Sequence, residues 1–312
     1  MKRSYHICLS SDDEVMFRDI EDYNRGFNIF ALALHKTSST GLVESFMSNH
    51  VHMLVQTDNP DQFMNAFRMP YTKYFNHRHK RTGSLGEKHH FTLEVKGLHH
   101  HLITISYILR NALHHGVAPI PYAYPHSSVN VIFQKEMGKS PIKETIPSNR
   151  FYRFIGRHQS FPESYKMATD GVFLRESVLD IPQVENMFVT PRNFDYYMSR
   201  RTTEDWIKEQ EKDHNNAAPI TLSLIESKVS MNSLEEMLTL ESGRSDYYKI
   251  SDIDLCRKID EIVREQLHKS SIYNLTQEEK TNLARQIRNN YHPSNAQLTR
   301  CLALNYPTVQ KK

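Results

Sequence analysis

Two histidines spaced one residue apart, His50 and His52, are the clearest chemical signal in this sequence. They lie in the mostly apolar stretch Met47–Val55, whose composition predicts a β-strand. Successive side chains of a strand point to opposite faces, so the two imidazoles share one face. Paired imidazoles on a rigid element can bind a metal ion. The pair alone is a weak signal, because a third ligand and a reactive group must come from elsewhere.

A tyrosine and an asparagine one helical turn apart form the second candidate pair. Apolar residues recur at helical spacing from about Leu98 to His115, and Gly116 is a typical residue to end a helix. The helix divides into an apolar stripe and a more polar one, namely Leu98, Leu102, Ile105, Leu109 and Leu113 against His100, Thr104, Tyr107, Asn111 and His114. We expect the polar stripe to face away from the core. Tyr107 is then either an ordinary surface tyrosine or a nucleophile, with Asn111 beside it.

Basic and aromatic residues gather between these two candidates. The formal net charge of the chain is only +3, which does not by itself indicate a nucleic-acid partner. The local excess is stronger, because Arg78, Lys80 and Arg81 follow a helix with aromatic residues. Cations next to aromatic rings suit single-stranded nucleic acid. We interpret Tyr71 and Phe75 of that helix as core residues, the basic run as a DNA contact, and most of the nearby histidines as solvated.

The elements that position these residues follow a simple order. We expect a strand at residues 4–10, a helix at 19–36, strands at 40–47 and from 50, a helix at 60–77, a strand at 91–96 and the helix at 98–115. The order β-α-β-β-α-β-α predicts an α+β fold, with a ferredoxin-like antiparallel sheet and helices on one face.

Three parts of the chain differ in pattern. Residues 1–137 hold the elements above, and residues 138–219 are rich in proline and read as a connector that wraps the scaffold. Residues 220–312 form a helical C-terminal region, in which Thr276–Glu279 resembles a capping box. Short helices near the end, with a third starting at residue 305, resemble a helix-turn-helix module. A plain helical bundle is the alternative.

The cysteines and the hydropathy pattern indicate the cellular compartment. Cys8, Cys256 and Cys301 are scattered and odd in number, so we expect reduced thiols rather than a disulfide framework. No stretch is long and apolar enough for a membrane span, and no signal segment opens the chain. We therefore expect a cytoplasmic protein.

Four ordered segments carry a resemblance to a known family. They are Met47–Leu54, Tyr74–His79 before Gly83, Ser106–Asn111, and Tyr124–Ser128. The first matches the pattern Met-Pro-Asn-His-x-His with Ser48 in place of proline, and the last is similar to a Tyr-x-x-Ser-Ser segment. Over residues 4–130 the chain resembles the HUH-type single-tyrosine transposases, in particular the REP-associated tyrosine transposases. Gly86 and Ala112 depart from the aromatic residue and the proline common in that family, which bears on the substrate groove.

The resemblance implies a site and a reaction. It implies an HUH nuclease fold in a bacterial protein, with His50, His52 and Asn111 as ligands of a divalent metal ion, Mg²⁺ or Mn²⁺. Tyr107 would be the catalytic nucleophile. The product would be a 5′-phosphotyrosine and a free 3′-hydroxyl, from single-stranded or hairpin DNA. The implied DNA-binding residues are Arg78, Lys80, Arg81 and Arg110, and a homodimer is an expected assembly.

Two other functions are compatible with the same residues. The first is a DNA-binding regulator that keeps the fold without catalysis. The second is a replication-initiation or relaxase nuclease, which shares paired histidines and a tyrosine but is usually longer. Only the enzymes predict a covalent link between Tyr107 and DNA.

Overall fold

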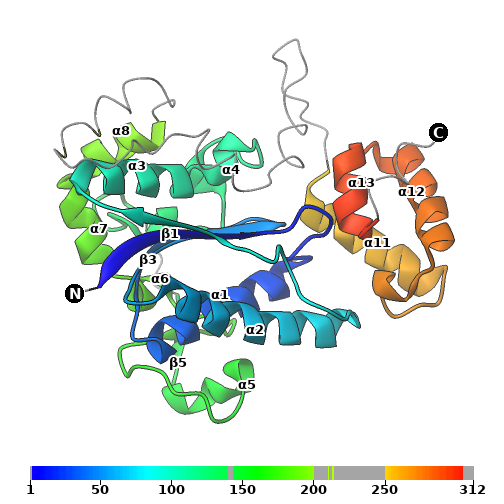
Figure 1. Cartoon of the computed structure of the whole chain (residues 1–312), viewed down its shortest axis with the longest axis horizontal. Helices are drawn as coiled ribbons and strands as arrows, with labels where there is room; N and C mark the ends of the chain where they lie inside the picture. The colour runs from blue at the N-terminus through cyan, green and yellow to red at the C-terminus, as the bar shows by residue number, and fades with distance from the viewer. Residues whose placement is uncertain (1, 140–142, 200–209, 211–212, 214–249, 305–312) are drawn as a thin grey trace.

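A computed structural model describes residues 2–139, 143–199, 210, 213 and 250–304 (Figure 1). The elements of the first part are β1 (Arg3–Ser10), α1 (Ile20–Lys36), β2 (Thr40–Phe46), β3 (His50–Thr57), α2 (Pro60–His79), β4 (Phe91–Val95), α3 (Leu98–Leu109), α4 (Asn111–His114), η1 (Pro121–Ala123) and η2 (Ser128–Val131). Then follow β5 (Thr145–Ile146), η3 (Ser148–Arg150), α5 (Tyr152–Ile155), β6 (Met167–Ala168), α6 (Arg175–Val178), α7 (Ile181–Phe188), α8 (Pro191–Ser199), α11 (Asp252–Glu265), η6 (Ile272–Asn274), α12 (Gln277–Tyr291) and α13 (Asn295–Leu302).

The central feature is a four-stranded antiparallel sheet with the order β2-β3-β1-β4. The two strands that flank the turn at Ser48 form the expected hairpin, and β1 pairs with β3 so that Cys8 lies opposite His52. The α+β class and the predicted order of elements are confirmed. The strand order and the register between β1 and β3 place the histidine pair on a central strand of the sheet.

Helices cover both faces of the sheet, so the expectation of helices on one face only was wrong. α1 and α2 pack together below the sheet in Figure 1, whereas α3 lies above it and contacts β2 and β3. The reason lies in the central strands: every residue of β3 except Gln56 is buried. A strand that is apolar or buried on both faces needs a layer on each side.

Residues 143–199 contribute to the same hydrophobic core as the sheet. Phe173, Phe188 and Phe194 are almost fully buried in that core, and α7 and α8 contact α3. The backbone N–H of Asp180 donates to the carbonyl of Gly41 at 2.9 Å, which joins the stretch to the edge strand β2. Residues 143–199 of the predicted connector therefore belong to the core of the sheet domain, and most of residues 200–219 lie outside the described residues.

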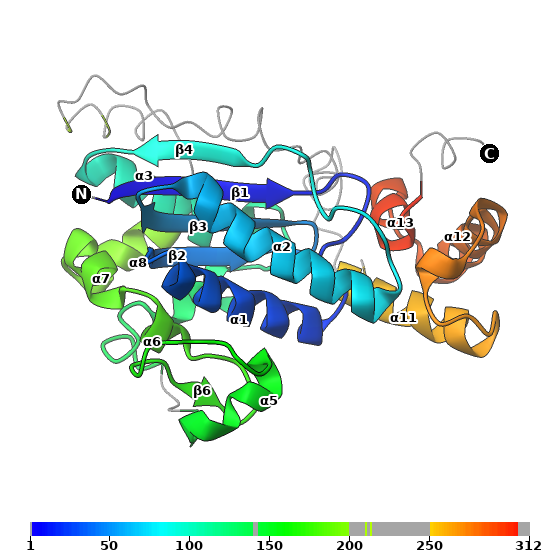
Figure 2. The same cartoon turned by 60° about the horizontal axis from the view of Figure 1, so that its bottom comes forward.

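The helices α11, α12 and α13 form a second hydrophobic cluster, which we call the C-terminal module (residues 250–304; Figure 2). Capping boxes begin α12 at Thr276 and Glu279, as predicted, and α13 at Ser294 and Gln297. From residue 296 to its end, α13 is buried, so it presents no face for reading a DNA groove. The third helix of the predicted helix-turn-helix lies outside the described residues.

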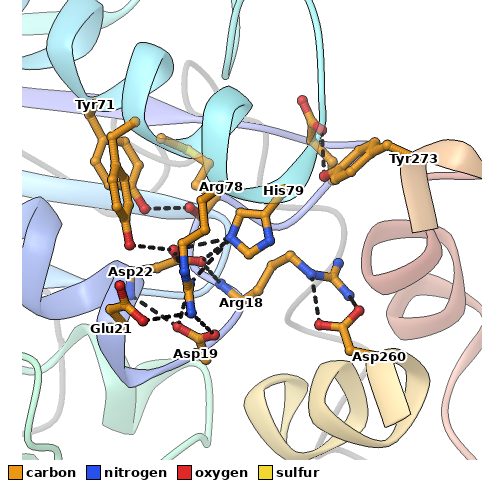
Figure 3. A network of polar contacts seen from close by, with 12 residues as sticks. Arg18, Asp19, Glu21, Asp22, Tyr71, Arg78, His79, Asp260 and Tyr273 are labelled. Carbon is orange, nitrogen blue, oxygen red and sulfur yellow. Dashed lines mark hydrogen bonds and ion pairs between the residues drawn. The ribbon is translucent and has the colours of Figure 1, made fainter. Parts of the chain in front are cut away.

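The C-terminal module is joined to the sheet domain by residues of the loop before α1. Val15 packs into the module's apolar cluster. The Arg18 guanidinium, about 1% exposed, donates to Asp260 at 2.7 Å and to the Cys301 carbonyl at 3.0 Å (Figure 3). None of the helices in the described ranges is long and apolar enough to cross a membrane.

Candidate active site

His50 and His52 project from β3 toward α3 and α4, as strand alternation requires. Their ring centroids are 5.0 Å apart and both side chains are buried. His50 Nε2 lies 2.8 Å from Asn111 Oδ1. The structure thus brings together the three residues predicted as metal ligands, although Asn111 is 61 residues away from His50 along the chain.

The hydrogen bonds of Asn49 decide which nitrogen of His50 carries the proton. Asn49 Nδ2 donates to the Ser11 carbonyl at 3.0 Å, so its Oδ1 accepts from His50 Nδ1 at 3.0 Å. Burial lowers the pKa of His50 to about 4, so the ring is neutral near pH 7 and has one N–H. Its Nε2 therefore presents an electron pair, and Asn111 Oδ1 presents another. Ligands at right angles on an ion about 2.1 Å away are about 3 Å apart, so this pair fits a small divalent cation.

The orientation of the Asn111 amide has one alternative. If its oxygen and nitrogen exchanged places, Asn111 Nδ2 would donate to His50 Nε2, and the pair would be an ordinary hydrogen bond that fastens α4 to β3. In the orientation observed, Asn111 Nδ2 has no hydrogen-bond partner within the described part of the chain. A buried amide nitrogen without a partner is costly. A cation on Oδ1 would favour the observed orientation, although it would not supply Nδ2 with an acceptor.

Tyr107 lies beside the histidine pair, on the face of α3 that points to the sheet. Its ring centroid is 5.2 Å from that of His52, and only 3% of the residue is exposed. The expectation that the polar stripe of this helix faces away from the core was wrong, because Thr104, Tyr107 and Asn111 are all buried. The polar stripe of α3 packs against the sheet, and α7 and α8 also contact the helix. The predicted single helix is divided at Arg110, so Tyr107 and Asn111 belong to α3 and α4.

Two further histidines complete the cluster, and sequence reasoning did not assign them to it. His6 on β1 places its Nε2 3.0 Å from His52 Nδ1, and its ring centroid is 5.9 Å from that of Tyr107. The ring of His115 lies 5.4 Å from that of His50. Alternation along β1 could have shown that His6 shares a face with Cys8. Only the register between β1 and β3 shows that this face is also the face of His52.

Burial keeps these imidazoles uncharged. It lowers the pKa of His6 to about 3, and burial with the charges of neighbouring histidines lowers the pKa of His52 and His115 well below the usual value. Neutral imidazole is the form that binds metals. Across the described ranges, no three or more His, Cys, Asp or Glu side chains are placed to hold a metal ion. Binding here would therefore depend on His50, His52 and the Asn111 amide, with water in the remaining positions.

The structure gives the predicted DNA contacts very different environments. Arg78 forms ion pairs with Asp19, Glu21 and Asp22 at 2.6 to 2.9 Å (Figure 3). Arg81 is paired with Glu14. These two guanidinium groups already have carboxylate partners, which lowers the charge that they offer to a phosphate.

The other two predicted DNA contacts also differ from each other. Lys80 is exposed at the end of α2, where its backbone adopts a left-handed conformation with φ 56°. Arg110 is half-buried next to Asn111, and burial lowers its pKa. Only Lys80 is fully available at the surface.

A more accessible basic surface lies along α2. A cavity of about 580 Å³, which we call the α2 groove, is lined by three cations and by apolar, polar and glycine residues, namely Arg68, Lys73 and Lys88 with Asn65, Met69, Thr72, Ser84 and Gly86. Arg68 donates to the carbonyls of Leu85, Gly86 and Lys88 and so fixes the loop after α2. Lys73 and Lys88 are exposed and have no carboxylate partner among the residues described. Their charge was visible in the sequence, but their common surface depends on the path of the loop.

The C-terminal module borders the candidate site. Ser48 Oγ donates to Asp252 Oδ2 at 2.6 Å, and Asp252 is also paired with the buried Arg300 at 2.5 Å. The charge of Arg300 contributes to the lowered pKa of His50 and His115, after burial. The module therefore lies against the turn before β3, the strand that carries His50 and His52.

Comparison with known proteins gave only weak structural similarity to the solved structure described here. No protein-family model matches the chain, and no curated protein matches it. A solved structure of the REP-associated tyrosine transposase bound to a REP hairpin aligns with 12% sequence identity, over 46% of this chain and 85% of that chain, with a TM-score of 0.37. A TM-score of this size does not establish a common fold. The function proposed below therefore rests on the motifs and the side-chain geometry of this chain.

Proposed function

We propose that the protein is a metal-dependent endonuclease and strand transferase of the HUH type, a transposase-like enzyme that cleaves and rejoins single-stranded or hairpin DNA. The observation that carries the proposal is the convergence of His50 Nε2 and Asn111 Oδ1, 2.8 Å apart, with the ring of Tyr107 beside His52. The order of the motifs in the sequence supports the same function. Paired imidazoles, an amide and a tyrosine in one buried cluster are what a metal-assisted phosphoryl transfer requires.

Each residue has a defined role in this reaction. His50, His52 and Asn111 would hold the divalent ion, and Mg²⁺ or Mn²⁺ bound there would stabilise the charge that develops on the scissile phosphate. The hydroxyl oxygen of Tyr107 attacks the phosphorus, and its proton passes to a base. The bond from phosphorus to O3′ breaks, and the leaving oxygen takes up a proton. The product is a 5′-phosphotyrosine, whose bond energy is kept for rejoining by the reverse reaction.

The enclosed site requires a movement before DNA is cleaved. Tyr107, His50, His52 and Asn111 are each at most 3% exposed, and a phosphodiester cannot reach a side chain that is covered on all sides. The C-terminal module lies next to these residues through Ser48. Separation of the module from the sheet domain is therefore one way for substrate to enter.

DNA contacts outside the cluster follow from the accessible charges. We propose Lys80, Arg110 and the α2 groove as the contacts with phosphates, because Lys73 and Lys88 are exposed cations. Arg78 and Arg81 contribute less, since their carboxylate partners compete with phosphate. The proposal includes a homodimer, in which two such sites act on two strand ends.

The same burial favours a second candidate function. A histidine cluster this enclosed can also serve as a hydrogen-bonded core, with Asn111 in its reversed orientation. The protein would then be a DNA-binding regulator without catalysis. Both functions predict binding to hairpin DNA, and only the first predicts a covalent product.

The deciding experiment uses the full chain with single-stranded and hairpin oligonucleotides of varied sequence, in Mn²⁺ or in EDTA. We expect a protein–DNA adduct on a denaturing gel in Mn²⁺ only. Tyr107→Phe should abolish it. Tyr122→Phe is the matched control, because Tyr122 bonds Asp195 at an exposed position outside the cluster. Absence of an adduct across the whole set would favour the regulator, and an adduct with Tyr107→Phe would show that another residue is the nucleophile.

A further inference from the structure

His6 is not one of the proposed metal ligands, but it contacts His52, which is. His6 Nε2 and His52 Nδ1 are 3.0 Å apart, and both rings are fully buried. The two residues are diagonal neighbours on adjacent strands, because Cys8 is the residue directly opposite His52. The contact is therefore fixed by the backbone register and not by a flexible side chain alone.

Proton counting leaves two arrangements for this pair of neutral rings. In one, His6 Nε2 donates its proton to His52 Nδ1, so His52 carries its own proton on Nε2 and cannot bind a metal there. In the other, His52 Nδ1 donates to His6 Nε2, and His52 Nε2 keeps its electron pair. The same number of protons is present in both arrangements. They differ only in which ring nitrogens carry them.

The second nitrogen of each ring makes no competing hydrogen bond among the described residues. His52 Nε2 and His6 Nδ1 are buried and have no hydrogen-bond partner in the part of the chain described. The rings near His52 include those of His50 and Tyr107, with centroids 5.0 and 5.2 Å away, and the ring of Phe91 lies 5.4 Å from that of His6. The hydrogen bond with His6 is the contact of His52 that can set its tautomer.

We propose that His6 is a positioning residue for the metal site: it accepts the Nδ1–H of His52 and so directs the electron pair of His52 Nε2 toward the ion. This inference rests on the proposed function. Asn49 does the same for His50 through its Oδ1, so both histidines of the pair have a partner that holds the proton away from the ligating nitrogen. Such outer partners of metal-binding histidines commonly change metal affinity about 10- to 100-fold when removed.

The test reads the tautomer directly and does not require catalysis. In protein labelled with ¹⁵N-histidine, long-range ¹H–¹⁵N correlation spectra distinguish a protonated Nδ1 from a protonated Nε2, and His52→Gln assigns the signals of His52. For the wild-type protein in saturating Mg²⁺, we expect His52 to be protonated on Nδ1. Protonation of His52 on Nε2 in saturating Mg²⁺ would overturn the proposal without any variant.

Variants at residue 6 give a second measurement. His6→Phe keeps an aromatic ring without the acceptor, and we expect about 10-fold weaker Mn²⁺ binding by calorimetry and a change of the His52 tautomer. His6→Gln restores an acceptor and should recover most of both. Phe91→Leu alters the packing against His6 and should change neither. A folded His6→Phe protein with the wild-type tautomer and Mn²⁺ affinity would refute the proposal. Failure to form a DNA adduct would count against the nuclease and leave the tautomer result intact.

Discussion

Ser48 Oγ donates a 2.6 Å hydrogen bond to Asp252 Oδ2, and this bond connects the turn before β3 to the first helix of the C-terminal module. Ser48 precedes His50 by two residues. The transposase pattern that this segment resembles has a proline at this position, which has no hydroxyl to donate. The bond therefore links the candidate metal ligands to a module at the other end of the chain in a manner that depends on this sequence's own serine.

The first prediction concerns that bond. Ser48→Ala should lower the free energy of unfolding by about 1 to 2 kcal/mol, because a buried carboxylate loses one donor. Urea unfolding at pH 7.5 measures the loss. Ser84→Ala is the matched control, since Ser84 is exposed, and its effect should be near zero. Equal stability of the Ser48→Ala and wild-type proteins would contradict the proposed importance of the bond.

The second prediction concerns the buried ion pair in the module. Arg300 and Asp252 are both buried, and Asp252 accepts from the Arg300 guanidinium at 2.5 and 2.8 Å. Arg300→Met should cost about 3 to 5 kcal/mol, because it leaves Asp252 buried without its partner. Replacing both residues, with Asp252→Leu added, should recover part of that loss. If the double variant is no more stable than Arg300→Met, the unpaired carboxylate is not the cause.

The third prediction is loss of stability in mild acid. Burial lowers the pKa of His50 to about 4 and of His6 and His126 to about 3. The unfolded chain protonates these residues near pH 6.5, before the folded protein does. Stability should therefore be complete above pH 6.5 and fall as the pH drops toward 4, by up to about 3 kcal/mol for His50 alone.

Urea unfolding at pH 7.5 and pH 5 measures this dependence. His126→Phe should reduce it, because it removes one titrating ring that stacks on Tyr23 outside the candidate metal site. An unchanged free energy of unfolding between the two pH values would show that the buried histidines do not remain neutral.

The fourth prediction separates cations that bind DNA from cations that stabilise the fold. Lys73→Gln with Lys88→Gln should weaken binding of a single-stranded oligonucleotide and reduce the dependence of log Kd on log salt concentration by about 0.7 per lost phosphate contact. Arg78→Gln should mainly destabilise the protein, because Asp19, Glu21 and Asp22 would lose the guanidinium that pairs with all three. Fluorescence anisotropy at several salt concentrations gives the slopes. The reverse result, with Arg78→Gln reducing the slope and the lysine pair leaving it unchanged, would exclude the α2 groove.

The sequence predicted the elements of the sheet domain closely, because their periodicity and caps are local. The helix predicted at 19–36 is observed as Ile20–Lys36 with Asp19 as its cap, and the strand pair around Ser48 is a hairpin. The direction of the polar stripe on α3 was not predictable, because polarity usually indicates solvent and here it indicates a buried cluster. The partners of Arg78 were also hidden, since Asp19 and Asp22 are far from it in sequence.

For the candidate site, the sequence predicted four of the clustered residues but not the side chains that surround them. His50, His52, Tyr107 and Asn111 were recognisable from type and order. The place of His6 in the cluster follows from the register between β1 and β3, and the burial of the site follows from packing of α3 against β2 and β3. Both depend on contacts between segments far apart in the chain, which no local pattern encodes.

The position of Arg18 determines how the protein can be divided for study. Its guanidinium belongs to the sheet domain by sequence and to the C-terminal module by its bonds to Asp260 and Cys301. A fragment that ends before residue 250 would keep the arginine and lose both acceptors, with Val15 uncovered beside it. Removal of the helices would therefore expose an apolar side chain and an arginine without these acceptors next to the hairpin turn. A minimal protein has to retain the module or redesign that loop.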